Sequence, residues 1–227
     1  MRHFGLIGRK LGHSWSAEYF ARKFAEEQIE ADYRLIELHE ICDVQNLTLD
    51  GYNVTIPYKT AILPYLQALD PIAKIIGAVN VVKNGKGYNT DWIGFKQSLS
   101  DILTKHHTVV SNALILGRGG AAKAVKYALE QMNIAAEMMS ARGKIAANIR
   151  QYELIVNATP LGMSPDVNTY PDMDYPALTD KHILFDCVYN PEETEFLRRG
   201  KAQGATTVNG RRMLEIQAEE SWKIWNN

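Results

Sequence analysis

A short apolar run followed at once by a glycine-rich turn constrains the fold of this chain more than any other feature. The run is Ala113–Leu116, and the turn reads Gly117-Arg118-Gly119-Gly120-Ala121-Ala122. A fully apolar strand is typical of a parallel sheet that is covered on both faces. In the pattern Gly-x-Gly-x-x-Ala, the first glycine permits a tight turn, the second admits a pyrophosphate, and the small third residue lets the helix pack on the strand. The segment therefore predicts a dinucleotide-binding unit; an ordinary β–α turn is the alternative.

Short apolar runs alternate with helical patterns along the rest of the chain. This alternation predicts an α/β architecture with parallel sheets. We expect strands at 4–8, 33–38, 51–57, 78–82, 113–116, 135–139, 154–158, 182–186 and 205–208, and helices at 17–28, from about 92, at 121–132 and at 212–225. The main boundary between two units is expected near residues 95–112, with the C-terminal helix returning to the first unit.

Composition excludes several classes of protein. The 227 residues carry 25 Lys+Arg against 26 Asp+Glu, so the net charge is 25 − 26 = −1 and a nucleic-acid-binding protein is disfavoured. No run approaches the roughly 18 apolar residues of a membrane span, and the N-terminus lacks a signal-peptide pattern. Cys42 and Cys187 form neither a zinc spacing nor a disulfide framework, so we expect idle thiols, a cytoplasmic location and no metal.

The strand after the glycine turn bears on the choice of dinucleotide. NAD sites place an acidic residue about 20 residues beyond the turn, and Glu137 lies near that distance. Glu137 falls inside the predicted strand, however, whereas the strand ends at Ser140-Ala141-Arg142. A guanidinium pairs well with a 2′-phosphate, so Arg142 favours NADP over NAD; a solvated loop arginine is the alternative.

Polar residues follow several predicted strands, where α/β proteins build their sites. Each has a plain structural alternative when it is taken alone. Ser14 or Ser16 suits a helix N-cap, and Thr55 suits a strand. Lysines such as Lys59 are usually solvated, and residues such as Asp91 usually cap helices. The remaining candidates, Asn80 and Asn89, suit turns.

Taken together and in order, these segments resemble the shikimate dehydrogenase family almost from end to end. The most specific strings are Asn53-Val54-Thr55-Ile56-Pro57-Tyr58-Lys59 and Asn157-Ala158-Thr159-Pro160-Leu161-Gly162-Met163. The others are Gly12-His13-Ser14-Trp15-Ser16, Gly77-Ala78-Val79-Asn80, Asn89-Thr90-Asp91, the glycine turn, Asp186-Cys187-Val188-Tyr189-Asn190-Pro191 with Thr194, Asn209-Gly210, Met213-Leu214 and Gln217-Ala218. Within the first of these, we expect His13 to be structural.

The resemblance implies two domains with the active site in the cleft between them. Residues 1–95 plus about 211–227 would form an α/β substrate domain with a mostly parallel sheet, and 96–210 a Rossmann-like NADP-binding domain. The implied reaction is the reversible NADP-dependent reduction of 3-dehydroshikimate to shikimate, on the chorismate route to aromatic amino acids. The expected partner is this small substrate, with no nucleic acid or membrane, and the protein would be a monomer or homodimer.

The resemblance also assigns roles to residues. Lys59 is the expected acid/base residue and Asp91 its partner. Both would also bind substrate, as would Ser14, Ser16, Thr55, Asn80, Tyr189 and Gln217. The cofactor would lie along Gly117, Arg118, Gly119, Gly120, Ala121, Ser140, Ala141, Arg142, Asn157, Thr159, Cys187 and Gly210.

The residue types suit that chemistry. A small ring with a carboxylate and several hydroxyls needs many neutral hydrogen-bonding groups, which Ser, Thr, Asn, Gln and Tyr supply. Reducing a ketone brings a hydride to carbon and a proton to oxygen, and an ammonium such as Lys59 can donate that proton. The hydride chemistry belongs to the nicotinamide cofactor.

The chain departs from the family in three places. The family usually has Asn-Arg-Thr after the strand that follows the glycine turn, whereas this chain reads Ser140-Ala141-Arg142. The connections near 38–51 and 139–146 are also short, which indicates either trimmed loops or residues missing from the sequence. The alternatives are a quinate/shikimate dehydrogenase that accepts NAD or NADP, and a catalytically silent member with a binding role.

Overall fold

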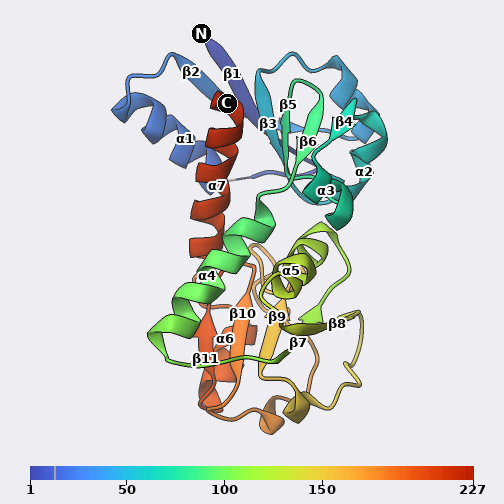
Figure 1. Ribbon diagram of the computed structural model, residues 1–227, viewed down its shortest axis with the longest axis vertical. Helices are drawn as coiled ribbons and strands as arrows, with labels where there is room; N and C mark the ends of the chain where they lie inside the picture. Colours follow the sequence, from blue (N-terminus) through green and yellow to red (C-terminus); the bar gives the residue numbers. More distant parts are fainter. Residues whose placement is uncertain (13) are drawn as a thin grey trace. The chain divides into compact units, whose positions relative to one another are not determined.

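A computed structural model describes residues 1–12 and 14–227, and the prediction for His13 lies outside the described residues. The chain divides into two compact units (Figure 1). Unit 1 comprises Met1–Thr90 and Ala218–Asn227, and unit 2 comprises Asp91–Gln217. The predicted α/β class is confirmed, because strands and helices alternate through both units.

Unit 1 contains a six-stranded mixed sheet with the strand order β2-β1-β3-β5-β6-β4. β1 pairs in parallel with both β2 and β3, and β4 pairs in parallel with β6. The pairs β3–β5 and β5–β6 are antiparallel. A tight turn at Asn84 and Gly85, both with positive φ, connects β5 to β6. The strand bounds are β1 Arg2–Gly8, β2 Ala31–Glu37, β3 Gly51–Val54, β4 Ala68–Leu69, β5 Val81–Lys83 and β6 Lys86–Tyr88.

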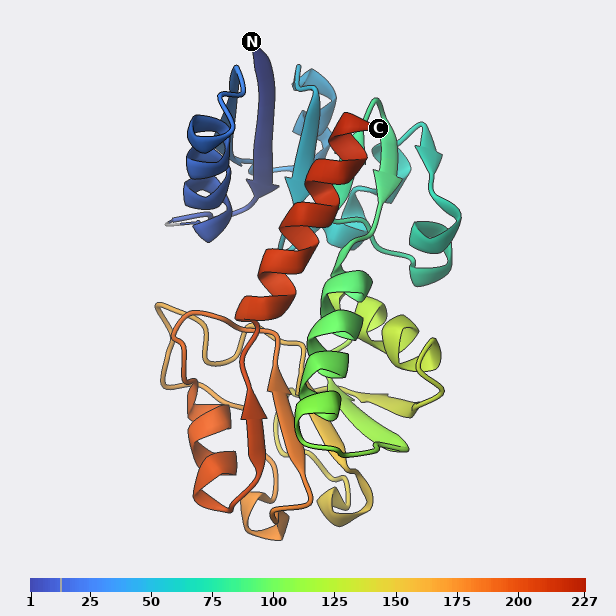
Figure 2. The same cartoon turned by 60° about the vertical axis from the view of Figure 1, so that its left-hand side comes forward.

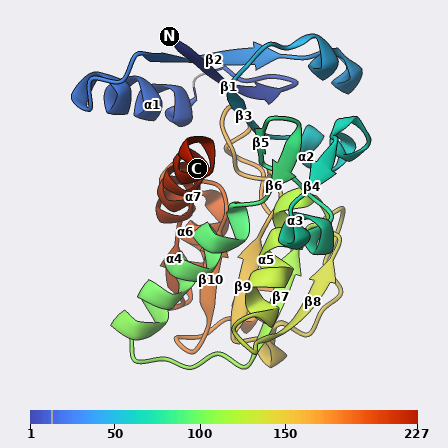
Figure 3. The same cartoon turned by 45° about the horizontal axis from the view of Figure 1, so that its top comes forward.

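The helices of unit 1 are α1 (Trp15–Glu26), α2 (Tyr58–Ala61) and α3 (Pro71–Ile76), with 3₁₀ turns at Ile41–Asn46 and Leu63–Tyr65. α3 follows directly from its sequence. The Asp70 side chain accepts a hydrogen bond from the Ile72 backbone N–H at 3.0 Å, Pro71 occupies the first turn, and Gly77 ends the helix with φ 66°. Figure 3 shows this short helix beside β4 and β6.

An aromatic cluster closes the core of unit 1 against the end of the chain. The ring of Phe4 in β1 stacks on Trp225 at 4.8 Å between centroids, and Phe20 in α1 stacks on Tyr33 at 4.7 Å. The Trp225 indole N–H also donates to the Val82 carbonyl at 3.2 Å. These contacts explain why Ala218–Asn227 belong to unit 1, whereas the first part of the helix expected to return there belongs to unit 2.

Unit 2 contains a five-stranded, fully parallel sheet in the order β11-β10-β9-β7-β8. The strands, shown toward the lower part of Figure 2, are β7 Asn112–Leu116, β8 Ala135–Met139, β9 Leu154–Asn157, β10 Ile183–Asp186 and β11 Thr206–Val208. β9 and β10 are buried along their whole length, and β7 is buried except at its first residue. Helices α5 (Gly120–Glu130) and α6 (Glu195–Ala202) follow β7 and β10.

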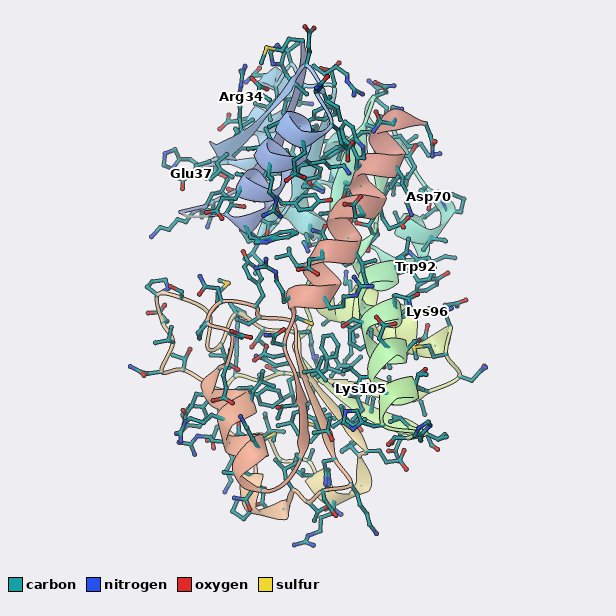
Figure 4. All side chains as sticks on the ribbon, turned by 90° about the vertical axis from the view of Figure 1, so that its left-hand side faces the viewer. Arg34, Glu37, Asp70, Trp92, Lys96 and Lys105 are labelled. Carbon is teal, nitrogen blue, oxygen red and sulfur yellow. The ribbon has the colours of Figure 1, made fainter. Side chains whose placement is uncertain are left out.

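Two further helices lie at the ends of unit 2. They are α4 (Asp91–Lys105), which Trp92, Lys96 and Lys105 mark in Figure 4, and the first part of α7 (Arg211–Asn226). The division falls at Thr90/Asp91, earlier than the 95–112 expected from sequence, because α4 packs on unit 2. Phe95 lies 4.7 Å from Phe185 in β10, and Trp92 meets Tyr127 of α5 edge-on at 5.3 Å.

Every strand and helix expected from the sequence is present, with shifts of a few residues at the ends. The largest shifts are in the strand expected at 51–57, which ends at Val54, and in the strand expected at 78–82, which begins at Val81. Pro57 precedes α2. The short elements α3, α6, β4 and β6 were not predicted. Each is too short for a clear periodicity, which is the signal that sequence patterns supply.

Candidate active site

In unit 1, the order of the strands gathers the predicted polar residues at one edge of the sheet. The chain passes from β1 through α1 to β2 on one side, and then returns to β3 on the other side of β1. Such a switch point opens a crevice at the carboxyl ends of the two strands, where ligands bind in α/β proteins. Ser14 and Ser16 follow β1, and Thr55 and Lys59 follow β3, so these residues all come from the two segments that leave this edge.

Backbone hydrogen bonds fix these segments. Thr55 donates its N–H to the Ile7 carbonyl at 2.9 Å, and the Lys59 carbonyl accepts from the Val79 N–H at 2.7 Å. Ser14 precedes α1 in the N-cap position, but its side chain makes no capping hydrogen bond. Ser14 and Ser16 are each 8% exposed. The Ser14 hydroxyl therefore does not cap α1, which was the structural alternative to a role in substrate binding.

A network of buried side chains lies behind this edge. The Asn80 amide donates to Thr90 Oγ1 at 2.9 Å and its carbonyl accepts the Thr90 backbone N–H at 2.7 Å. Thr90 Oγ1 lies 3.4 Å from Ser221 Oγ in α7, and Ser221 accepts from the Asn53 amide at 2.9 Å. The Tyr33 hydroxyl donates to Asn53 at 2.8 Å, and burial raises the pKa of Tyr33 well above its usual value.

Sequence reasoning gave a substrate role to Asn80 but missed the residues that hold it. Thr90 and Ser221 are fully buried, and Asn53 is 5% exposed. Asn53 and Thr90 stood inside motifs quoted from the sequence, so a signal existed for both. Ser221 gave none, because a serine within an amphipathic helix usually faces solvent.

The remaining predicted substrate residues belong to unit 2. Asp91 is the first residue of α4 and is 4% exposed. Gln217 is 9% exposed, and its amide donates to the Leu214 carbonyl at 3.0 Å. Tyr189 is half-buried in the segment after β10.

The glycine turn of unit 2 has the geometry of an anion-binding turn. Gly117 has φ +126°, and a Cβ placed there would lie 2.9 Å from the Ala158 carbonyl oxygen. By contrast, nothing lies within 4 Å of a Cβ built on Gly119, and no side chain caps the start of α5. Uncapped N–H groups and open space at a helix N-terminus fit a pyrophosphate. Gly120 and Ala121 begin α5, and Arg118 is exposed.

The turn also lies at a switch point. β7 runs between β8 and β9, and the chain leaves β7 toward β8 before it returns to β9. Ser140, Ala141 and Arg142 directly follow β8, with the Arg142 N–H donating to Ser140 Oγ at 3.3 Å, and Arg142 is exposed. The competing acid, Glu137, lies within β8 and accepts the Tyr152 hydroxyl at 2.6 Å. This geometry favours the Arg142 interpretation of the cofactor site.

The other predicted cofactor residues lie at the carboxyl ends of the next strands. Asn157 ends β9 and is fully buried, while Thr159 and Cys187 are half-buried in the segments after β9 and β10. Gly210 precedes α7, and a Cβ there would collide with the Cys187 carbonyl. Asp186, which has no role in the sequence analysis, is fully buried among these residues. Burial raises the pKa of Asp186 to about 7, although hydrogen bonds from Thr194, Val188 and Asn157 act to lower it.

Residues 1–12 and 14–227, which the structure describes, contain neither a helix that could span a membrane nor a cluster that could hold a metal. No helix there has the length and apolar character needed to cross a membrane. In the same part of the chain, His, Cys, Asp and Glu side chains form no group of three or more that could hold a metal ion. Cys42 is exposed and Cys187 is half-buried, and the two cysteines form no disulfide.

The chain is similar in sequence to known proteins. Residues 6–82 match the family model described as the shikimate dehydrogenase substrate binding domain. A shikimate dehydrogenase (NADP(+)) of Desulforamulus reducens is 33% identical over 258 residues, covering 97% of this chain and 88% of the relative. That span exceeds the chain by 258 − 227 = 31 residues, so the relative has segments without a counterpart here.

Solved structures are also similar. The shikimate 5-dehydrogenase of Thermus thermophilus, in complex with NADP(H) and shikimate, has a TM-score of 0.85 at 28% identity and covers 99% of this chain and 93% of its own. A quinate dehydrogenase of Corynebacterium glutamicum in complex with NAD has a TM-score of 0.83, also at 28% identity, with 99% and 93% covered. Sequence identity of a third along nearly the whole chain, together with this fold, shows that the chain belongs to the shikimate dehydrogenase family.

Proposed function

We propose that this protein is an NADP-dependent shikimate dehydrogenase, which reversibly reduces 3-dehydroshikimate to shikimate on the chorismate route to aromatic amino acids. The observation that carries the proposal is family membership along nearly the whole chain, with the motif residues standing at the carboxyl edges of both sheets. In this proposal, unit 1 is the substrate domain and unit 2 the cofactor domain.

Lys59 is assigned as the acid/base residue, with Asp91 as its carboxylate partner. As an ammonium, Lys59 donates a proton to the carbonyl oxygen of 3-dehydroshikimate and stabilises the negative charge that develops there. In the oxidative direction Lys59 accepts the hydroxyl proton of shikimate. NADPH, when bound, supplies the hydride that reaches the carbonyl carbon.

The other polar residues bind and orient the ring. Ser14, Ser16, Thr55, Asn80, Tyr189 and Gln217 offer hydroxyl and amide groups to the carboxylate and hydroxyls of the substrate. A site built from such groups rejects analogues that lack a hydroxyl, because its own buried groups would lose their partners.

Unit 2 would hold the cofactor along the residues predicted from its motifs. The uncapped start of α5 and the open space at Gly119 suit the pyrophosphate, and Arg142 suits the 2′-phosphate of NADP. The Glu137 carboxylate accepts a hydrogen bond from the Tyr152 hydroxyl instead of facing a ribose, which supports NADP over NAD.

The proposal extends to a cytoplasmic protein, supported by two cysteines that form no disulfide, and to a monomer or homodimer. Light scattering on the purified protein tests the oligomeric state.

Steady-state assays with shikimate and with quinate, each with NADP and with NAD, test the function. We expect the highest kcat/KM with shikimate and NADP. Preference for quinate or NAD would instead identify a quinate/shikimate dehydrogenase. No NADPH oxidation with 3-dehydroshikimate, in protein that binds both ligands, would identify a silent member with a binding role.

A further inference from the structure

Asp186 is a buried carboxyl group for which the reaction above has no use. It is the last residue of β10 and is fully buried. Asp186 Oδ1 accepts from the Asn157 amide at 3.0 Å and from the Val188 backbone N–H at 2.9 Å. Asp186 Oδ2 shares a hydrogen bond of 2.6 Å with the Thr194 hydroxyl. A buried carboxyl group is costly unless such partners compensate it, so its position at this edge requires an explanation.

The first partner connects Asp186 to the segment after β9. Asn157 also donates to the Leu161 carbonyl at 3.1 Å. Its side-chain oxygen accepts from the Thr159 N–H at 3.1 Å and from the Thr159 hydroxyl at 2.6 Å. The conformation of residues 157–161 therefore depends on an asparagine that the Asp186 carboxyl group holds in place.

The other partners connect Asp186 to the segment after β10 and to its end at α6. Thr194 caps α6 by accepting from the Leu197 N–H at 3.4 Å, and a Cβ on Gly162 would lie 3.2 Å from Thr194 Cβ. Val188 in turn accepts the Gly210 N–H at 3.0 Å through its carbonyl oxygen. One carboxyl group thus joins the segments that leave β9, β10 and β11.

These segments lie on the side of the switch point that the rest of a dinucleotide must reach. A dinucleotide crosses the crevice at the switch point, with its pyrophosphate at the helix that follows the glycine turn. In unit 2, that turn follows β7, and Arg142 follows the neighbouring edge strand β8. The adenosine half therefore extends toward β8, and the nicotinamide half toward the carboxyl ends of β9 and β10.

We propose that Asp186 is a positioning residue for NADP, whose carboxyl group holds segments 157–162 and 187–194 in the arrangement that receives the nicotinamide half. The proposal rests on the proposed function. Asp186 acts through Asn157, Val188 and Thr194 and does not itself touch the cofactor. An asparagine at this position retains the arrangement, because its carbonyl accepts from Asn157 and Val188 while its amide donates to Thr194.

The test compares D186A with D186N by titrating the protein with NADPH and following nucleotide fluorescence, alongside kcat and KM. D186A leaves three buried donors without their acceptor, so we expect its NADPH Kd to rise at least ~10-fold and kcat to fall. D186N restores Kd to within ~3-fold of wild type. T194V, which removes one of the three hydrogen bonds to Asp186 together with the α6 cap, gives a smaller rise in Kd and provides the result if D186A does not fold.

V110A is the matched control, because Val110 is a buried residue just before β7, at the opposite edge of the same sheet. We expect V110A to lower Tm without changing the NADPH Kd. The proposal is overturned if folded D186A and T194V bind NADPH with the wild-type Kd, or if D186N raises the Kd as much as D186A does. It is also overturned if V110A raises the NADPH Kd as its Tm falls, because a general loss of stability would then explain the effect. Wild-type protein that binds NADPH but does not oxidise it with 3-dehydroshikimate would refute the proposed reaction while leaving this binding test intact.

Discussion

The carboxyl edges of the two sheets share a switch-point topology but offer a ligand different chemistry. At the edge of unit 1, polar side chains such as Asn80, Thr90 and Ser221 are buried and bonded to one another. At the edge of unit 2, the glycine turn presents backbone N–H groups beside open space. The first edge depends on the identity of side chains, whereas the glycine turn of the second edge depends on the absence of side chains. Substitutions should therefore fail in different ways at the two edges.

Lys59→Ala should give the largest effect. Loss of a positioned acid/base group typically costs about 10²–10⁴-fold in rate, so we expect kcat for 3-dehydroshikimate reduction to fall in that range. Lys59 belongs to unit 1, so the NADPH Kd should stay unchanged. Stopped-flow and steady-state kinetics measure the first quantity, and nucleotide fluorescence measures the second. Normal turnover in this variant would remove Lys59 from the mechanism.

The pH dependence of stability distinguishes the two edges next. Burial raises the pKa of Asp186 from 3.8 to about 7, so folding favours the protonated acid. Its stabilising contribution is complete below pH 3.8 and is lost as the pH rises through about 7, by up to ~4 kcal/mol. The Tm of wild type relative to D186N should therefore fall between pH 5 and pH 8. A constant difference in Tm over this range would contradict the raised pKa.

Gly117→Ala and Gly119→Ala separate folding from binding at the glycine turn. Gly117 has φ +126° and lies close to Ala158, so a side chain there is strained by about 1–3 kcal/mol and should lower both Tm and NADPH affinity. Gly119 has φ −77° and open space, so alanine there should leave Tm unchanged. It should still weaken NADPH binding, because its methyl group occupies the space left for the pyrophosphate. Thermal melts and NADPH titrations on both variants give the comparison, and equal NADPH affinity in wild type and Gly119→Ala would exclude the turn as the pyrophosphate site.

Thr90→Val tests the side-chain network of unit 1. Valine has nearly the same shape but lacks the oxygen that accepts from the Asn80 amide, so we expect the KM for shikimate to rise about 10-fold. The backbone hydrogen bond from Thr90 to Asn80 persists, which limits the loss. Thr90→Ser keeps the hydroxyl and should retain a KM near that of wild type. The network has no role in substrate binding if valine and serine behave alike.

The sequence predicted the elements with strong patterns, and its motifs supplied the residues proposed to meet a ligand. The apolar β7 with its glycine turn, and the strings around Lys59 and Asn157, are local signals that need no tertiary information. Asp186 was different: its place at the end of an apolar strand was visible, but its partner Asn157 lies 29 residues away. Ser221 reaches Asn53 across 168 residues. Partners that only the fold brings together leave no periodicity or spacing in one sequence.

The same limit explains the difference in the boundary between the units. The glycine turn indicates a second unit, and the stretch before it lacks a clear helix or strand pattern. The sequence therefore predicts that the first unit ends near residues 95–112. Side-chain contacts of Trp92 and Phe95 with unit 2 decide otherwise, and a helical pattern does not reveal which sheet its apolar face covers.

Arg142→Ala should give the smallest effect, because Arg142 is an exposed charged side chain that would contact only one phosphate of the cofactor. Arg142 is exposed, so its contact with a 2′-phosphate is partly screened by solvent, and we expect the KM for NADP to rise only about 5-fold. NAD lacks that phosphate, so its KM should not change. Lys144→Ala removes an equally exposed charge from the same segment and should leave the ratio of the two KM values as in wild type. Steady-state kinetics with both cofactors measure the ratio, and equal weakening of NADP and NAD by Arg142→Ala would show that the arginine does not read the 2′-phosphate.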